Sequence, residues 1–177
     1  MNFRSPIVFS VLLAMFFAGS LLGAQERWPA ARASSVQVMM MRTNGTQVPA
    51  EFQVSLYENL IGQLEKRSVF KRVYRDGDLN AVAEPDLIEI QCTVQKFEKG
   101  SEKMRQVTTV AGATSMTLHC EFKDKAGNLL LERDITGKVR FFGGNLKATY
   151  DFAKKAANVA AENFSPVAGR NSSPARR

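Results

Sequence analysis

The sequence predicts one α/β (α+β) domain with a mixed sheet of about five strands, and three patterns lead to this prediction. A helical pattern lies between two short strand patterns, which implies a parallel β-α-β unit. Three longer segments then alternate apolar and polar residues, which is typical of antiparallel strands with one wet face. A helix rich in small residues follows them. We expect this domain over residues 35–164.

The N-terminal 24 residues have the composition of a secretory signal peptide. An apolar run over residues 7–22 follows Arg4, which carries the one charge of this stretch, and the stretch ends at Ala24. The run is shorter than the roughly 20 residues that a membrane-spanning helix prefers, so we expect cleavage, with an uncleaved anchor as the alternative. The chain is therefore predicted to be exported and periplasmic in a bacterium, with membrane association as the alternative, and to have a flexible leader over 25–34.

The β-α-β unit is expected to fill the first part of the domain. A short strand over residues 36–40 precedes a turn signal at Asn44. Residues 49–67 predict an amphipathic helix, because bulky apolar residues recur there at four-residue spacing. A second strand follows in SVFKRVYR, over 68–75, where Val69, Phe70 and Val73 are its apolar residues. One helical turn is expected over 79–84.

The three longer strands are expected to form an antiparallel meander. In 88–95 and 116–123 the even-numbered residues are apolar and the odd-numbered residues are polar, so one face is buried. The loop DKAGN offers Gly127 for a positive φ and leads into the last strand, over 129–142. Residues 165–177 carry three arginines without any period and predict a disordered basic tail.

A second helix is expected over residues 146–164, where Asn145 is a fair N-cap after a break at Gly143 and Gly144. The N–H groups and the dipole at a helix start can meet a phosphate or a carboxylate. Gly143, Gly144 and Asn145 are therefore a candidate anion site. Ordinary capping of the helix is the alternative interpretation.

The two cysteines, Cys92 and Cys120, lack CxxC spacing, which argues against zinc or a thioredoxin-type redox pair. Both fall on apolar positions of strands that are predicted to be neighbours. A disulfide that persists in an oxidising compartment is one interpretation. Two small buried hydrophobic residues are the other.

Several motifs carry a resemblance to a known family. A helix is followed by the strand motif Phe70-x-x-Val73, Asp86 opens an apolar strand, and residues 124–127 form an Asp-x-x-Gly hairpin. This arrangement resembles the bacterial family 4410 among domains of unknown function, and more distantly the periplasmic domain of curli-secretion-channel proteins. The resemblance covers residues 36–164. It implies an α/β domain without an established activity.

The loop over residues 98–113 begins charged and ends apolar, and it keeps one glycine in a region where that family tends to have several. An extended hairpin that continues the flanking strands is one interpretation. An exposed apolar edge that meets another protein or lipid is the other. The candidate contact residues of this loop are Arg105, Val107, Val110 and Gly112.

Composition and motifs argue against several functions. The chain has 24 basic and 17 acidic residues, for a formal net charge of +7, and the two signs interleave as on solvated surfaces. In an exported protein this excess favours anionic surfaces over nucleic acid, so we expect no nucleic-acid partner.

His119 is the one histidine, and no nucleophile motif accompanies it on its predicted solvent-facing strand position. We expect no enzyme activity, no cofactor and no metal.

These observations favour an exported binding or assembly module for a periplasmic or outer-membrane complex, acting through a sheet edge or the loop over 98–113. The sequence specifies neither the partner nor the oligomeric state. One alternative is binding of an anionic membrane or lipopolysaccharide through the basic surface. An alternative of another class is a hydrolase that uses His119.

Overall fold

The computed structural model describes residues 32–107, 112–139 and 144–164. The predicted signal peptide, most of the leader and the basic tail lie outside these residues. The described chain forms a five-stranded mixed sheet in the order β2-β1-β3-β4-β5, which confirms the predicted fold class. The strands are β1 (Ser35–Val38), β2 (Arg72–Arg75), β3 (Leu87–Glu98), β4 (Thr114–Asp124) and β5 (Leu129–Val139).

The β-α-β unit occupies one side of the sheet. Strand β1 pairs in parallel with both β2 and β3. Helix α1 (Ala50–Arg67) connects β1 to β2, and the 3-10 turn η1 (Leu79–Ala83) connects β2 to β3. Both connections were expected, but β1 ends before Met40, and β2 begins at Arg72 although the preceding Phe70 is buried. The remaining strands form the predicted antiparallel meander.

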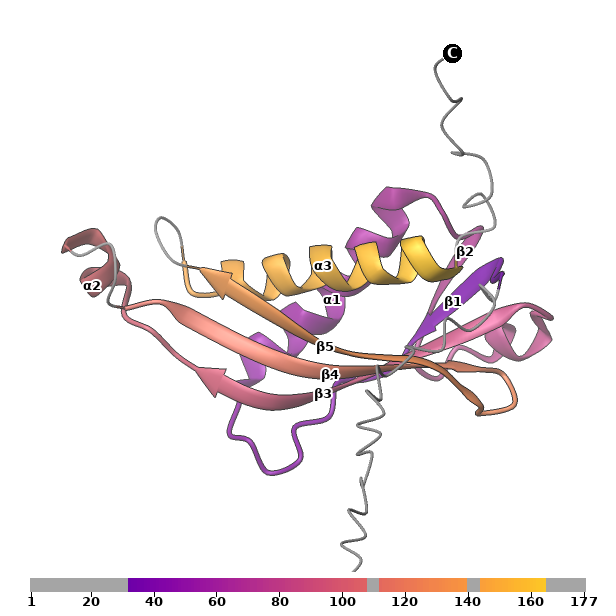
Figure 1. The fold of residues 1–177 in the computed structure, drawn as a ribbon, viewed down its shortest axis with the longest axis horizontal. Helices are drawn as coiled ribbons and strands as arrows, with labels where there is room; N and C mark the ends of the chain where they lie inside the picture. The colour runs from indigo at the N-terminus through magenta and orange to yellow at the C-terminus, as the bar shows by residue number, and fades with distance from the viewer. Residues whose placement is uncertain (1–31, 108–111, 140–143, 165–177) are drawn as a thin grey trace, which may run out of the picture.

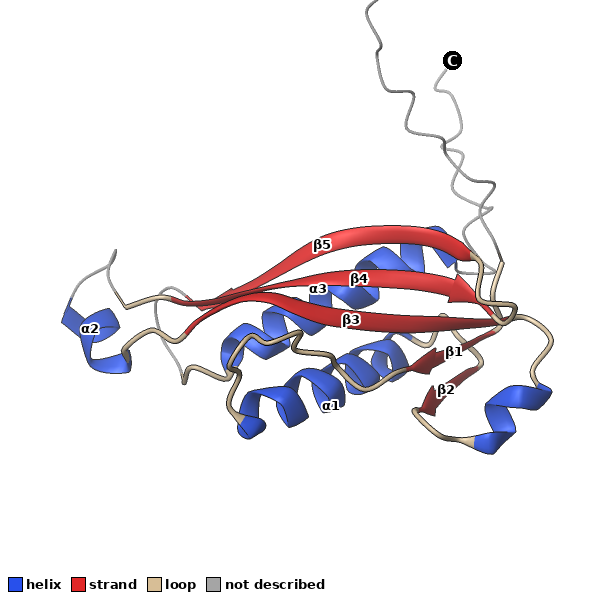
Figure 2. Cartoon of the chain, turned by 90° about the horizontal axis from the view of Figure 1, so that it is seen from below, coloured by secondary structure: helices blue, strands red, loops and turns tan. Residues whose placement is uncertain are grey.

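The domain has two layers. Helix α1 and the C-terminal helix α3 (Lys147–Phe164) lie side by side on one face of the sheet, as Figures 1 and 2 show. No helix covers the other face of β3, β4 and β5 within the described chain (Figure 2). Odd-numbered polar residues of β4 therefore stay partly exposed, while its even-numbered residues are buried against the helices.

The core confirms the alternation that the sequence predicts. The even-numbered residues of the central strands are 0–2 % exposed, and they are Ile88, Ile90, Cys92, Val94, Met116, Leu118, Cys120 and Phe122. A register shift between Val94 and Lys96 then changes the parity of β3. This bulge turns Phe97 toward the helix layer. There its ring packs edge-to-face on the ring of Phe52 in α1, with 4.8 Å between the ring centroids.

Helix α3 approaches β5 closely at Gly137. A Cβ atom at this position would lie 2.2 Å from the carbonyl oxygen of Ala148 and 2.6 Å from the Cβ of Phe152. Small residues on the facing side of α3 are fully buried, which is how the helix backbone comes this near to the strand. Gly137 therefore sets the separation of the two layers.

The two ends of the domain differ. At one end, the Ala33 N–H donates a 3.0 Å hydrogen bond to the Phe164 carbonyl oxygen, so the first and last described segments meet there. At the opposite end, the short helix α2 (Glu102–Val107) lies between β3 and β4 (Figure 1). The extended hairpin that was one interpretation of this loop is wrong, because β3 ends at Glu98 and β4 begins at Thr114.

We predict opposite effects for alanine at two glycines. Gly137→Ala should lower the free energy of unfolding by about 2 kcal/mol, because the new methyl group must displace α3. Gly62→Ala should raise it by about 0.5 kcal/mol, because Gly62 is a helical position with nothing within 4 Å of an added Cβ. Urea denaturation of both variants measures these changes. Equal stabilities of the two variants would contradict the close approach.

Candidate functional site

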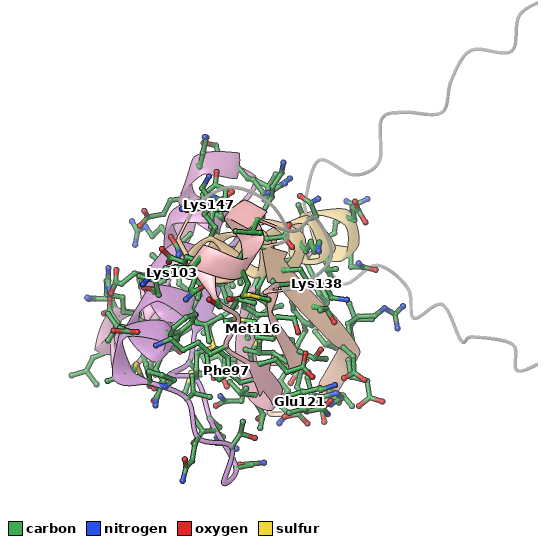
Figure 3. The ribbon with its side chains drawn as sticks, turned by 90° about the vertical axis from the view of Figure 1, so that its left-hand side faces the viewer. Phe97, Lys103, Met116, Glu121, Lys138 and Lys147 are labelled. Atoms are coloured by element: carbon green, nitrogen blue, oxygen red, sulfur yellow. A yellow bond between two sulfur atoms is a disulfide. The ribbon has the colours of Figure 1, made fainter. Side chains whose placement is uncertain are left out.

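The α2 end of the domain gathers most of the loop residues that the sequence singled out. We use "α2 end" for the surface formed by the described residues 96–107, 138–139 and 144–150. It combines the connection between β3 and β4 with the start of α3, two segments that are distant in sequence. Figure 3 views the domain from this side.

A chain of hydrogen bonds fixes α2 to the domain. The Gly100 N–H donates to Thr114 Oγ1 at 3.0 Å, and the Thr114 hydroxyl donates to Asn145 Oδ1 at 2.8 Å. The Asn145 N–H then donates to Glu102 Oε1 at 3.0 Å. These hydrogen bonds join α2, β4 and the start of α3. Thr114 at their centre is fully buried, which strengthens the two hydrogen bonds that it makes.

The candidate anion site lies at this network. Gly143 is outside the described residues, and Gly144 is exposed. The Asn145 N–H, which was expected to meet a ligand, instead meets the carboxylate of Glu102. Negative charge at a helix start is favourable, and here a side chain of the protein supplies it. The structure therefore places a carboxylate of the protein itself beside the segment that leads into α3.

Apolar side chains are exposed around this network. Met104 and Val107 of α2 are 48 % and 83 % exposed, and Leu146 and Tyr150 at the start of α3 are 41 % and 45 % exposed. Of the predicted loop residues, Val107 thus lies on the surface, while Val110 is outside the described part of the chain. Arg105 belongs to α2. The α2 end presents apolar groups to solvent on a fixed support.

Gly112, the remaining candidate of the loop, has a structural role in the backbone of this loop. Its φ is +87°, a conformation that glycine adopts readily. A Cβ on Gly100 would lie 2.1 Å from the Gly112 carbonyl oxygen, so the two limbs of the loop pass at close range. Both glycines shape the base of the α2 segment.

Positive charge is concentrated at the α2 end. Its residues include six basic and two acidic side chains, whereas the rest of the described chain has 12 basic and 14 acidic ones. Figure 3 shows Lys103, Lys138 and Lys147 around this end. Lys96 binds Glu98 at 2.9 Å, and this ammonium and the Ser115 hydroxyl hold the pKa of the Glu98 carboxyl below its usual range.

Both long helices point their N-terminal ends toward this surface. Helix α3 begins within it, and Glu51 in the first turn of α1 lies 3.8 Å from the ammonium of Lys99. A helix N-terminus carries a partial positive charge from its aligned peptide dipoles. Glu51 at the start of α1 and Glu102 beside the start of α3 offset part of this positive charge.

The cysteines form a disulfide in the centre of the sheet. Cys92 and Cys120 are directly opposite in the β3–β4 register, and both are fully buried. Of the two interpretations of the sequence, the structure contains the bridged form. Disulfides persist in oxidising compartments, so the bridge indicates a location outside the cytoplasm.

His119 lies on the uncovered face of the sheet, as predicted for a solvent-facing strand position. Its side chain is 31 % exposed, and its Nδ1 is 2.8 Å from Asp134 Oδ1, while Nε2 is 3.7 Å from Glu132 Oε2.

A cavity of about 350 Å³ lies elsewhere, at the end of the domain where Ala33 meets Phe164. Its lining contains neither histidine, serine nor cysteine: Arg32, Ala33, Pro85, Asp86, Leu87, Ile88, Asp124, Lys125, Ala126 and Leu130.

Side chains of α3 cover backbone groups at the outer edge of β5. The Lys138 N–H donates to Asp151 of α3 at 3.0 Å, and the Lys155 ammonium donates to the Thr136 carbonyl oxygen at 2.8 Å. Asp151 and Lys155 also pair with each other at 2.7 Å. Since these side chains satisfy outward-pointing backbone groups, they hinder addition of another strand at this end of β5.

The described residues contain neither a membrane-spanning helix nor a metal-binding cluster. None of the helices there is both long and apolar enough to cross a membrane. No three histidine, cysteine, aspartate or glutamate side chains within the described ranges are placed to hold a metal ion.

Fold and surface together define a two-layer α+β domain with one covered sheet face and a basic, partly apolar end. No family model matches the sequence, and no curated protein matches it either. The resemblance to family 4410 therefore rests on the motifs given above.

Two solved structures are similar to this chain, and the first of them shares its fold. A PelC dodecamer from Paraburkholderia phytofirmans matches with a TM-score of 0.54 at 14 % identity, covering 77 % of this chain and 93 % of that chain. Protein XCC0632 from Xanthomonas campestris, of family DUF330, gives a TM-score of 0.44 at 14 % identity, covering 76 % and 84 % of the two chains. At these identities the likeness shows the fold alone.

Sequence analysis missed several residues of the α2 end. Leu146 and Tyr150 were assigned to a helix without a surface role, and Thr114 and Glu102 were not singled out. Interleaved basic and apolar residues in the segment K-M-R-Q-V, over residues 103–107, were a usable signal. The contribution of the start of α3 depends on tertiary packing, which this local pattern does not contain.

We predict that Thr114→Val loosens α2. The substitution leaves the Gly100 N–H and the Asn145 side chain without the Thr114 hydroxyl, which should cost about 1–3 kcal/mol of unfolding free energy. Hydrogen exchange of residues 101–107 should accelerate. Thr117→Val, on the uncovered sheet face, is the control and should leave exchange of α2 unchanged. Unchanged exchange of α2 in Thr114→Val would show that this network does not hold the helix.

Proposed function

We propose that this chain is an exported, non-enzymatic binding or assembly module of the bacterial cell envelope, and that it attaches to its target through the α2 end. One observation carries the proposal: exposed apolar and basic side chains lie on α2 and on the start of α3, and hydrogen bonds through the buried Thr114 join these two segments. Contiguous apolar exposure beside polar groups is typical of interaction sites.

Two features support export to the periplasm. The composition of the first 24 residues is that of a signal peptide. The buried Cys92–Cys120 disulfide requires a compartment in which thiols are oxidised. Both agree with a role in the envelope.

Assembly as the mode of action has independent support from the fold. The PelC structure that shares this fold is described as a dodecamer. A domain of this architecture can therefore present surfaces to other chains. In this chain, side chains of α3 already bond the backbone groups of Thr136 and Lys138 at the edge of β5. Another chain is therefore not expected to add a strand there.

The geometry around His119 supports a non-enzymatic role. Its ring has carboxylate neighbours, as a general base requires, but it lies on an open sheet face. The neighbouring Thr117 hydroxyl is 2.9 Å from the Thr136 hydroxyl, with which it shares a hydrogen bond. We therefore assign the His119–Asp134 pair to cross-strand stabilisation.

Fractionation of cells that express the full chain tests this proposal. We expect wild-type protein in the envelope fraction in a species larger than the monomer. Met104→Ser with Val107→Ser should be exported normally but recovered as a free monomer, because it lacks the apolar contacts. Leu79→Ser with Val82→Ser is the matched control, since these η1 residues are 83 % and 66 % exposed outside the α2 end.

Two outcomes would contradict the proposal. Co-fractionation of the α2 double variant with wild type would show that this surface is not the attachment site. A growth defect of a strain that lacks this protein, restored by the α2 double variant and not by His119→Ala, would favour the hydrolase hypothesis.

A further inference from the structure

We infer that the target of the α2 end is a membrane surface of anionic lipid headgroups. This inference rests on the proposed function and names the chemistry of its target. It is carried by the juxtaposition of exposed lysines with exposed apolar side chains at one end of the domain. The residues concerned are Lys99, Lys103, Met104, Val107, Lys138 and Leu146.

Charge complementarity is the first argument. The α2 end holds an excess of four basic side chains, while the remaining described residues hold an excess of two acidic ones. Within the described residues this surface is therefore the positive side of the domain. Glu51 and Glu102 lie at the N-terminal ends of α1 and α3 and offset part of the helix dipoles there. An anionic membrane attracts such a surface and orients the molecule before contact.

The placement of the apolar groups is the second argument. Met104 follows Lys103 in α2, and Leu146 precedes Lys147 at the start of α3, so apolar and basic groups alternate on the surface. Lipid interfaces accept this combination, because apolar tips enter the acyl boundary while ammonium groups stay among the phosphates. Few apolar side chains are available, so both contributions are needed for stable attachment.

The kind of cation is the third argument. Five of the six basic residues at this end are lysines, and Arg105 is the sixth. Protein interfaces are depleted in lysine and enriched in arginine and large aromatic residues. A headgroup surface requires no fixed bidentate geometry, so flexible lysines suit it well. The composition therefore favours lipid over a protein surface.

Vesicle binding of the full-length protein tests the inference. Phosphatidylcholine vesicles with and without phosphatidylglycerol are compared, and residues 1–24, present in every variant, contribute equally throughout. Wild type should prefer the anionic vesicles, and added salt should weaken this preference. Lys103→Glu with Lys138→Glu should lower the affinity for anionic vesicles by about tenfold or more.

The matched control changes the same net charge elsewhere. Lys66 of α1 and Lys154 of α3 are exposed and lie outside the α2 end, so Lys66→Glu with Lys154→Glu should change the affinity less than about threefold. Circular dichroism verifies that each variant is folded. Met104→Ser with Val107→Ser should lose affinity while keeping its salt dependence.

Equal binding to neutral and anionic vesicles, or equal losses in the two lysine variants, would overturn the inference. In a third outcome, envelope attachment depends on Met104 and Val107, but vesicle binding does not depend on the α2 end. This outcome would overturn the lipid inference, leave the proposed function intact and indicate a protein target. The proposed function fails separately, when envelope attachment survives the α2 double variant.

Discussion

Burial of one sheet face beneath two parallel-running helices is the constraint on which the rest of the structure depends. It requires an unbroken apolar row across β3 and β4, small residues along α3 and a glycine at 137 where helix and strand backbones approach. The Cys92–Cys120 bridge joins the two central strands inside this layer. In a domain built in this way the packed layers form the centre, and the exposed apolar and basic groups of α2 lie at one end.

The two ends of the domain differ in their chemistry. Glu84, close to the joined chain ends, accepts hydrogen bonds from Tyr74 and Ser35, which hold the pKa of its carboxyl below the usual range and tie η1 to the sheet. At the far end, buried polar contacts through Thr114 support exposed apolar and basic groups. A docking surface benefits from such a support, because side chains on a segment that is already held in place lose less conformational entropy on binding.

Most of the fold could be predicted from the sequence, because periods of 2 and 3.6 residues directly report which face is buried. The strand over 88–95 and the helix over 49–67 are examples. The bulge that turns Phe97 inward could not be predicted, since it depends on the register with β4. The disulfide remained one of two interpretations for the same reason. At the site, Val107 was identified from its own segment, whereas the Asn145–Glu102 contact joins residues 43 positions apart.

The central claim is that the α2 end is the contact surface and the sheet is its scaffold. Hydrogen exchange of the full chain, with and without anionic vesicles, tests this claim most directly. The account predicts added protection in residues 100–107 and 144–150, with the amides of β3 and β4 already protected in both states. Added protection around His119 on the uncovered sheet face, with α2 unchanged, would contradict it.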